Sequence, residues 1–180
     1  NISHSSRATD FISPKSPVSR AFRDATLALA RDHAFARTLI NSGRLSTPTP
    51  YLDSSLNTPD EVHFAGNMRP GTNCADAPVS RNGERSWLLS HVGGSFVALS
   101  FGDPGITDFD VDGIACAVLA VGRDIEDCDG RLAERYDGKP GTTYLIRPDQ
   151  HVAARWRRFD RELIGSALDR ATCRVQGERR

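Results

Sequence analysis

The sequence lacks a long apolar run and an excess of charge of either sign. The longest apolar run, Ile114 to Val121, is far shorter than the ~20 residues that a membrane-spanning helix needs, and no signal segment opens the chain. Basic and acidic residues number 23 each, so no global field attracts nucleic acid or an anionic membrane. We therefore expect a cytoplasmic protein with neither kind of partner.

Closely spaced cysteines are also missing. No pair has the two-residue gap of a dithiol redox motif or a zinc knuckle, and none occupies an obvious helix N-terminus that would stabilise a thiolate. This pattern argues against a thiol oxidoreductase. We expect ordinary reduced thiols at Cys74, Cys116, Cys128 and Cys173.

The 180-residue length predicts one globular domain. The chain begins at Asn1, and its opening residues read as mid-chain sequence, although removal of an expression tag would give the same start. We therefore expect an upstream part in the native protein.

Residues 1–43 are predicted to form a helical arm that belongs to this upstream part. Ser16 and Pro17 are a good N-cap and first-turn pair for a helix from about Pro17 to Ala30. Asp32 is suited to cap a second short helix that stops at Gly43. The first helix carries an apolar stripe formed by Val18, Phe22, Ala25 and Leu29.

Residues 44–83 have little periodicity and hold half of the ten prolines. Structureless loops longer than ~15 residues are uncommon inside compact domains. We predict an extended linker that runs across the surface of another domain or subunit. A disordered linker is the alternative.

From residue 84 the pattern becomes α/β. Trp87 to Leu89 suggest a short helix, and two apolar strands follow at Ser95–Phe101 and Ile114–Val121. Ile106 to Val111, between them, is expected to be a short helix or crossover.

The remaining elements complete a sheet and a closing helix. Arg131 to Tyr136 is a short connecting element, and Thr143–Arg147 with His151–Trp156 reads as a hairpin that turns at Pro148 and Asp149. An amphipathic helix is predicted from about Phe159 to Ala171.

This order, βαβ followed by ββα, predicts the α/β fold class: a thioredoxin-like mixed sheet with flanking helices. We assign residues 84–172 to this domain and expect residues 173–180 to form a loose tail.

One acidic motif matches the opening of a calcium-binding loop. Asp108, Asp110, Asp112 and Gly113 have the required spacing, but the twelfth position is Leu119 where a bidentate Glu is needed. The residues of the expected exit helix form the apolar strand instead. We interpret the motif as a solvated acidic turn.

Other metal and nucleophile patterns are equally weak. The five histidines are scattered, no serine lies on a strand-to-helix elbow, and no glycine-rich phosphate loop is present. Ser95 follows two glycines, but the strand comes after it. A second acidic stretch is expected to face water at Asp124, Glu126, Asp127 and Asp129. We therefore name no catalytic, cofactor-binding or metal-binding residue.

A local basic cluster surrounds Trp156 and could grip phosphates or stack on a base. It consists of Arg155, Arg157, Arg158 and Arg161. We favour a solvated or interdomain salt-bridging face for these side chains. Arginines of the arm suit a helix against an acidic neighbour, namely Arg7, Arg20, Arg23, Arg31, Arg37 and Arg44.

Five stretches carry a family resemblance. They are Ser6–Ser16, Ser19–Asp24, Asn41–Ser46, Asp76–Val79 and Tyr144–Trp156, and the last is the most specific. These stretches resemble the C-terminal part of FAD-dependent aromatic-ring hydroxylases, the group that contains phenol and hydroxyphenylpropionate monooxygenases.

The resemblance implies a parent enzyme that binds FAD, takes hydride from NAD(P)H and hydroxylates a phenolic ring through a flavin hydroperoxide. In that family the flavin and substrate sites lie mainly upstream, and the C-terminal thioredoxin-like domain lacks the redox dithiol and acts as a covering, packing or dimer-contact module. No family catalytic residue maps onto this sequence. The resemblance therefore implies that this chain binds no cofactor itself.

Two hypotheses follow. In the first, the chain is a C-terminal structural fragment that is inactive alone and packs on the upstream FAD and substrate domains, with a homodimer left open. In the second, it is a free-standing thioredoxin-like binding module without redox cysteines that holds a ligand or partner with its hairpin and the Arg155–Arg161 face. The arm argues against the second hypothesis, since it would have no surface to cover.

Overall fold

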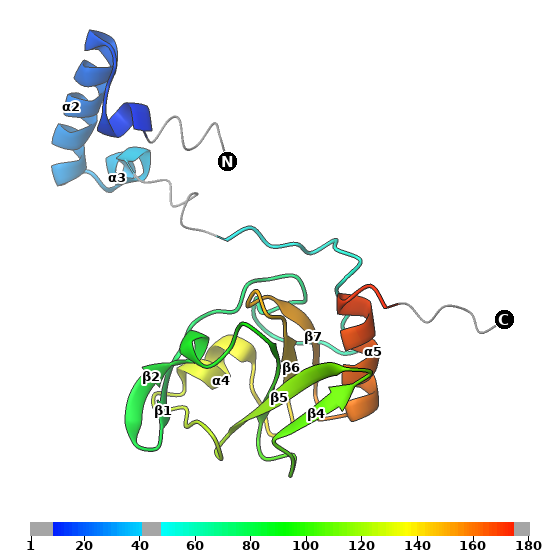
Figure 1. The fold of residues 1–180 in the computed structure, drawn as a ribbon. Helices are drawn as coiled ribbons and strands as arrows, with labels where there is room; N and C mark the ends of the chain where they lie inside the picture. Colours follow the sequence, from blue (N-terminus) through cyan, green and yellow to red (C-terminus); the bar gives the residue numbers. More distant parts are fainter. Residues whose placement is uncertain (1–8, 41–47, 175–180) are drawn as a thin grey trace. The chain divides into compact units, whose positions relative to one another are not determined.

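The computed structural model describes residues 9–40 and 48–174. The chain divides into two compact units, Asn1–Pro48 and Thr49–Arg180, which are considered separately (Figure 1).

The first unit is the predicted helical arm. Helix α2 spans Pro17–Asp32, and the Ser16 hydroxyl accepts a hydrogen bond from the Ser19 backbone N–H at 3.0 Å, as expected of its N-cap. Asp32, predicted to cap the next helix, is instead the last residue of α2, and α3 spans Ala34–Ile40. The predicted stop at Gly43 lies outside the described residues.

The apolar stripe of α2 is exposed. Val18, Phe22 and Leu29 are 79%, 57% and 45% exposed, whereas Thr26 and Ala36 are buried among the described residues of this unit. The stripe that the sequence predicted is therefore present, but the described part of the arm does not cover it.

The second unit is built on a five-stranded mixed sheet with the order β4-β5-β3-β6-β7. The central strand β3, Phe96–Phe101, runs parallel to β5, Ile114–Val121, and antiparallel to β6, Thr143–Ile146. The edge strands β4, Asp108–Val111, and β7, Val152–Trp156, pair antiparallel with β5 and β6. The predicted strands thus form one sheet.

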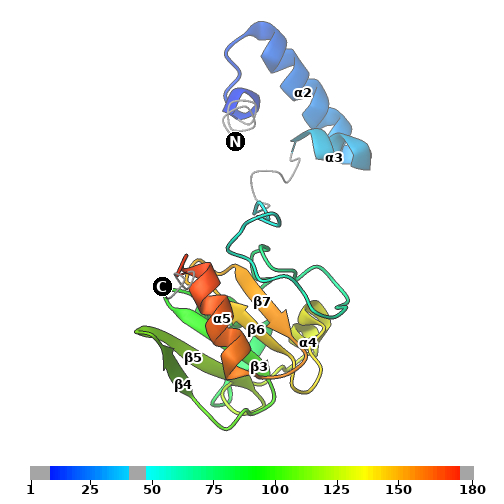
Figure 2. The same ribbon diagram turned by 90° about the vertical axis from the view of Figure 1, so that its right-hand side faces the viewer.

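Every residue of β3 is buried because the sheet is covered on both faces. Val97, Leu99 and Phe101 pack with helix α4, Arg131–Tyr136, on one face. The alternate residues pack with helix α5, Arg161–Ala171, on the other face (Figure 2). This arrangement confirms the predicted mixed α/β fold with flanking helices.

The connection between the parallel strands contains strand β4. Asp112 and Gly113 have φ values of 49° and 82°, and the Asp110 carboxylate accepts a hydrogen bond from the Gly113 N–H at 2.7 Å. Two successive positive φ angles favour a tight hairpin, so the chain turns back and pairs with β5. The predicted short helix or crossover is therefore a strand followed by a hairpin turn.

A second hairpin lies where the sequence predicted the end of a linker. Strands β1, Pro78–Arg81, and β2, Glu84–Trp87, pair through a turn in which Asn82 and Gly83 have φ values of 53° and 83°. The 3-10 helix η1, Leu88–Ser90, follows and corresponds to the short helix expected there. The hairpin was not predicted, although an Asn-Gly pair is a strong hairpin signal.

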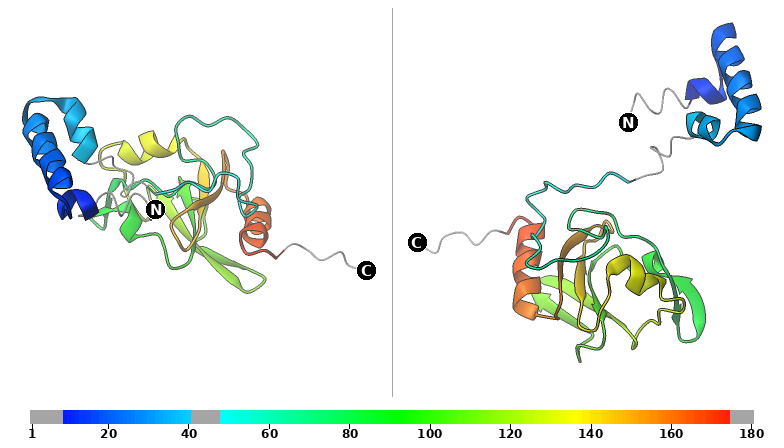
Figure 3. Two further views of the ribbon diagram at one scale, coloured as in Figure 1. Left: turned by 90° about the horizontal axis from the view of Figure 1, so that it is seen from above. Right: turned by 180° about the vertical axis from the view of Figure 1, so that it is seen from behind.

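The preceding segment, residues 49–77, is called the strap below. Its backbone bonds to the outer edge of β7: the N–H groups of Gly71 and Thr58 donate to Val152 and Ala153 carbonyls at 2.7 and 2.9 Å (Figure 3). Gly71 has a φ of 89°, and an added Cβ would lie 2.3 Å from the Tyr51 carbonyl oxygen. The surface that this segment covers is therefore the chain's own sheet, whereas we predicted another domain or subunit.

None of the helices within residues 9–40 and 48–174 combines the length and the apolar character needed to cross a bilayer.

Candidate functional site

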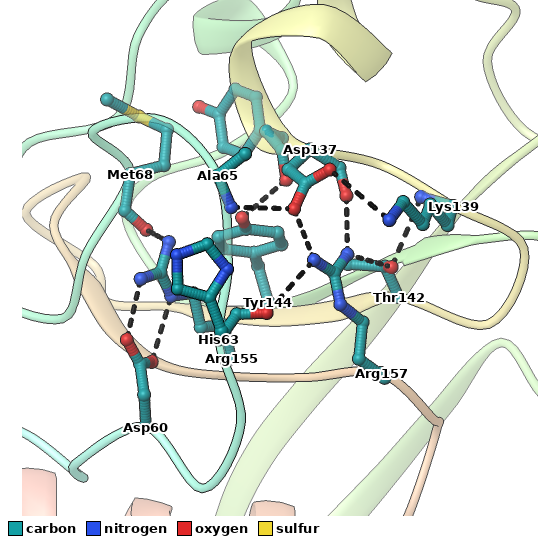
Figure 4. Close-up of polar contacts among 11 residues, drawn as sticks. Asp60, His63, Ala65, Met68, Asp137, Lys139, Thr142, Tyr144, Arg155 and Arg157 are labelled. Atoms are coloured by element: carbon teal, nitrogen blue, oxygen red, sulfur yellow. Dashed lines mark hydrogen bonds and ion pairs between the residues drawn. The ribbon is translucent and has the colours of Figure 1, made fainter.

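Two arginines of the predicted basic cluster hold the strap against the sheet. Arg155, whose side chain is 2% exposed, makes a bidentate pair with Asp60 through Nε and Nη2 at 2.8 and 2.6 Å. Its Nη1 donates to the Met68 carbonyl at 2.9 Å (Figure 4). This single side chain therefore binds the strap at two points.

Arg157 lies two residues further along and points to the same side. Its Nη1 donates to the Asp137 carbonyl at 2.7 Å and to the Thr142 hydroxyl at 3.2 Å, and its Nη2 contacts the Asp137 carboxylate. The same carboxylate accepts a hydrogen bond from the Ala65 N–H of the strap at 2.9 Å. Arg157 and Asp137 thus join the strap, the end of α4 and the sheet.

An aromatic ring of the strap connects the two arginines. The guanidinium carbons of Arg155 and Arg157 lie 4.4 and 3.8 Å from the centroid of the Phe64 ring. Phe64 is 6% exposed and meets Tyr144 edge to face, with centroids 6.2 Å apart. Guanidinium groups stack favourably on aromatic rings, more so when water is excluded. We call Asp60, Phe64, Asp137, Arg155 and Arg157 the arginine clamp.

The electrostatics of the clamp stabilise its charged forms. Burial opposes the charge on Arg155, but its hydrogen bonds with Asp60 and Tyr144 outweigh this effect and raise the pKa of the guanidinium. The hydrogen bond from Arg157 and then that from Ala65 hold the pKa of Asp137 below its ordinary value. Arg155 and Asp137 are therefore both held in their charged forms.

These contacts decide what the basic cluster does. The donors of Arg155 and Arg157 are directed at the chain's own carboxylates and carbonyls, so they serve packing and not a phosphate or a base. Arg158 pairs with Asp160 at 3.2 Å, and Arg161 lies 5.3 Å from the Phe109 ring centroid. The predicted solvated or interdomain face was wrong for Arg155, which is buried within one domain.

Sequence reasoning missed the strap partners of the clamp. Asp60 is 95 residues from Arg155, so no local pattern connects them. The available signal was an arginine inside the apolar strand at Val152–Trp156, because a buried guanidinium requires a carboxylate or carbonyl partner.

The two acidic motifs have structural roles. Asp110 closes the β4–β5 turn, Asp124 accepts a hydrogen bond from the Ala120 N–H at 2.8 Å, and Asp127 accepts from the Leu132 and Ala133 N–H groups at the start of α4. No group of three metal-ligating side chains occurs among the residues that the structure describes. The interpretation of the first motif as a turn is confirmed.

All four cysteines are free. Burial raises the pKa of the Cys74 and Cys116 thiols to about 12, so neither is a thiolate at neutral pH. Cys128 and Cys173 are exposed.

No protein-family model matches the chain, and no curated protein sequence matches it. Several solved structures are similar to it. Aklavinone-11 hydroxylase in complex with FAD and aklavinone is 22% identical, with a TM-score of 0.59 over 76% of this chain and 30% of that chain.

Two further structures show the same pattern. The flavin-dependent monooxygenase PieE, in complex with FAD and substrate, is 22% identical with a TM-score of 0.59, over 91% of this chain and 31% of its own. RebC soaked with K252c is 21% identical with a TM-score of 0.53, over 92% and 30%. The chain therefore spans about a third of the length of these structures, and its fold is that of a region of FAD-dependent aromatic hydroxylases, in agreement with the resemblance to their C-terminal part.

Proposed function

We propose that this chain is the C-terminal structural domain, with its helical arm, of an FAD-dependent, NAD(P)H-using aromatic-ring hydroxylase. The observation that carries the proposal is the fold likeness, which covers 76–92% of this chain but only 30–31% of three flavin enzymes. In this proposal the chain supplies packing or a dimer contact, and the catalytic centre with its FAD lies in the rest of the enzyme.

The arm supports a partner upstream of the sheet domain. An apolar helix stripe that stays exposed marks an interaction surface. Val18, Phe22 and Leu29 form such a stripe on α2, within the arm that we assign to the upstream part. The FAD and substrate domains of the parent enzyme are the proposed surface for this stripe.

The sheet domain supports a structural role. Its arginine clamp is directed at its own strap, which removes most of the Arg155–Arg161 face that the rival binding-module hypothesis requires. We assign the domain to the thioredoxin-like class because β6 runs antiparallel to both neighbours in the order β7-β6-β3-β5, with α5 after β7.

We also propose a cytoplasmic location, because all four cysteines are free thiols and reduced cysteines are typical of that compartment.

Flavin retention tests the proposal directly. The purified chain is expected to be colourless after incubation with FAD and gel filtration, and to oxidise no NAD(P)H when phenols are added. Flavin held tightly by the isolated chain would overturn the assignment of the catalytic centre to the rest of the enzyme.

The gene sequence upstream of Asn1 tests whether this chain belongs to a larger flavin enzyme. We expect the reading frame to continue upstream of Asn1 and to encode a G-x-G-x-x-G sequence on a strand-to-helix turn, which is the FAD fingerprint. A reading frame that is closed at both ends around this chain would favour the free-standing binding module.

A further inference from the structure

A surface pocket of about 370 Å³ lies beside the β1–β2 hairpin, which projects from the sheet domain in Figure 1. It is called the hairpin pocket and is lined by Arg81, Asn82, Glu84, Arg85, Ser86 and His91. The pocket is separate from the arginine clamp, and no role assigned so far uses its residues.

A serine and a histidine form a hydrogen-bonded pair in the pocket. The Ser86 hydroxyl and the His91 Nε2 are 2.7 Å apart. Burial and the charge of Arg81 lower the pKa of His91, so its imidazole is neutral at pH 7. A neutral imidazole donates through one nitrogen and accepts through the other, so the pair can present a donor to a bound oxygen.

The backbone around His91 is held rigidly. Gln150 Nε2 donates to the carbonyls of Leu89 and Val92 at 2.9 and 2.8 Å, and the His91 N–H donates to the Leu88 carbonyl at 2.8 Å. Asp76 accepts a hydrogen bond from the Leu89 N–H at 3.0 Å. The backbone that carries His91 is therefore positioned before any ligand arrives, and such preorganisation lowers the entropy cost of binding.

The guanidinium groups of the hairpin pocket are free to meet a ligand. The Arg81 guanidinium makes no hydrogen bond or ion pair with the part of the chain that the structure describes, although its charge helps to lower the pKa of Asp124. The Arg85 guanidinium makes one 3.4 Å contact, with Asp129, and the Arg85 side chain is 77% exposed. This contrasts with Arg155, whose donors are directed at the strap. With Glu84 as the one acidic lining residue, the pocket carries more positive than negative charge.

We propose that the hairpin pocket binds a small oxyanion of the phosphate class, held between the Arg81 guanidinium and the Ser86–His91 pair. The planar guanidinium matches two phosphate oxygens with parallel N–H donors, and a hydroxyl suits a third. The ligand is free phosphate or the phosphate group of a small ester, and the volume accommodates either. This binding site is independent of the proposed packing function.

The test is a titration of the ¹⁵N-labelled 180-residue chain with inorganic phosphate and, separately, with phenyl phosphate, each against sodium chloride of equal ionic strength. We expect saturable amide shifts at Asn82, Gly83, Ser86 and His91. Tighter binding of the ester would identify an esterified ligand, and equal or weaker binding would identify free phosphate.

Substitutions separate a built site from general attraction of anions. Arg81→Met is expected to weaken phosphate binding about tenfold, the effect of one charge-assisted contact, and Ser86→Ala severalfold. Arg131→Met is the matched control, because Arg131 is an exposed arginine on α4 whose ion pair is with Glu134. Shifts that do not saturate, or an affinity that Arg81→Met leaves unchanged or that Arg131→Met lowers equally, would overturn the proposal.

Discussion

The arginine clamp makes a prediction about which member of an ion pair is costly to remove. Asp60→Ala leaves the Arg155 guanidinium buried without a carboxylate, and its remaining partners are the Met68 carbonyl, the Tyr144 hydroxyl and the Phe64 ring. Arg155→Met leaves the Asp60 carboxylate, whose side chain is already 27% exposed and can turn to water. We therefore expect Asp60→Ala to destabilise the domain more than Arg155→Met.

The structure sets the magnitudes. Removing one partner of a buried ion pair costs about 3–5 kcal/mol, and the partial exposure of Asp60 lowers our expectation to about 2–3 kcal/mol. Arg155→Met keeps an apolar stem of similar length and is expected to cost about 1–2 kcal/mol through the unpaired Met68 carbonyl. The double variant is expected to cost about as much as Arg155→Met alone, because no buried charge remains.

The assay is urea unfolding followed by fluorescence and far-ultraviolet circular dichroism. Trp156 is 3% exposed and adjacent to Arg155, so its emission reports on the sheet next to the clamp. The matched control is Arg158→Met, because the Arg158 side chain is 63% exposed and an ion pair in water, such as the one with Asp160, is expected to contribute little to stability.

One result would refute this reasoning. If the costs of Asp60→Ala and Arg155→Met simply add in the double variant, Arg155 is not a buried charge that depends on Asp60. Local release of the strap without unfolding of the sheet would appear as faster hydrogen exchange at Thr58 and Gly71, whose N–H groups bond to β7, with the urea midpoint unchanged. The coupling between the two substitutions would then be measured by that exchange.

Three further predictions concern thiols, pH and the arm. Cys74 and Cys116 are expected to resist a thiol reagent at pH 7.5 in the native state, since burial raises both pKa values to about 12; labelling as fast as in urea would contradict this. The pKa of Asp137 is lowered by folding, so its stabilisation is present at neutral pH and is lost as pH falls below about 4. Asp137→Asn should therefore lower stability at pH 7 and flatten its loss in acid, and an unchanged pH profile from circular dichroism would be inconsistent with the clamp. Ser16→Ala should lower the stability of α2 by about 1 kcal/mol, because the Ser19 N–H loses its acceptor. Hydrogen exchange in the first turn of α2 measures this loss, and an unchanged exchange rate would exclude a capping role for Ser16.

Local patterns predicted the elements whose cause is local. The apolar runs of β3 and β5 and the amphipathic pattern of α5 can be read directly, because burial on two faces or on one face dictates the residue types along a strand or helix. The β1–β2 hairpin was not predicted, although Asn82 and Gly83 are a typical hairpin-turn pair, because the prolines around it favoured a linker.

The acidic motif Asp108–Gly113 before β5 was compatible with two structures. Alternating aspartates followed by a glycine suit both a calcium loop and a hairpin turn. Leu119 at the twelfth position removed the first reading, and the positive φ angles of Asp112 and Gly113 established the second. The turn was predictable from the residues, but the pairing of β4 with β5 was not.

The sequence by itself determined that the chain has an α/β sheet domain, a capped helix with an apolar stripe, and no closely spaced cysteine pair. Only the tertiary structure decided that the strap covers the edge of β7, that Arg155 is buried against Asp60, and that Ser86 and His91 meet in a pocket. The physical reason is the distance along the sequence over which each interaction acts. Helix and strand propensities depend on neighbouring residues, whereas the folded sheet selects the partner of a buried charge, which for Arg155 is 95 residues away.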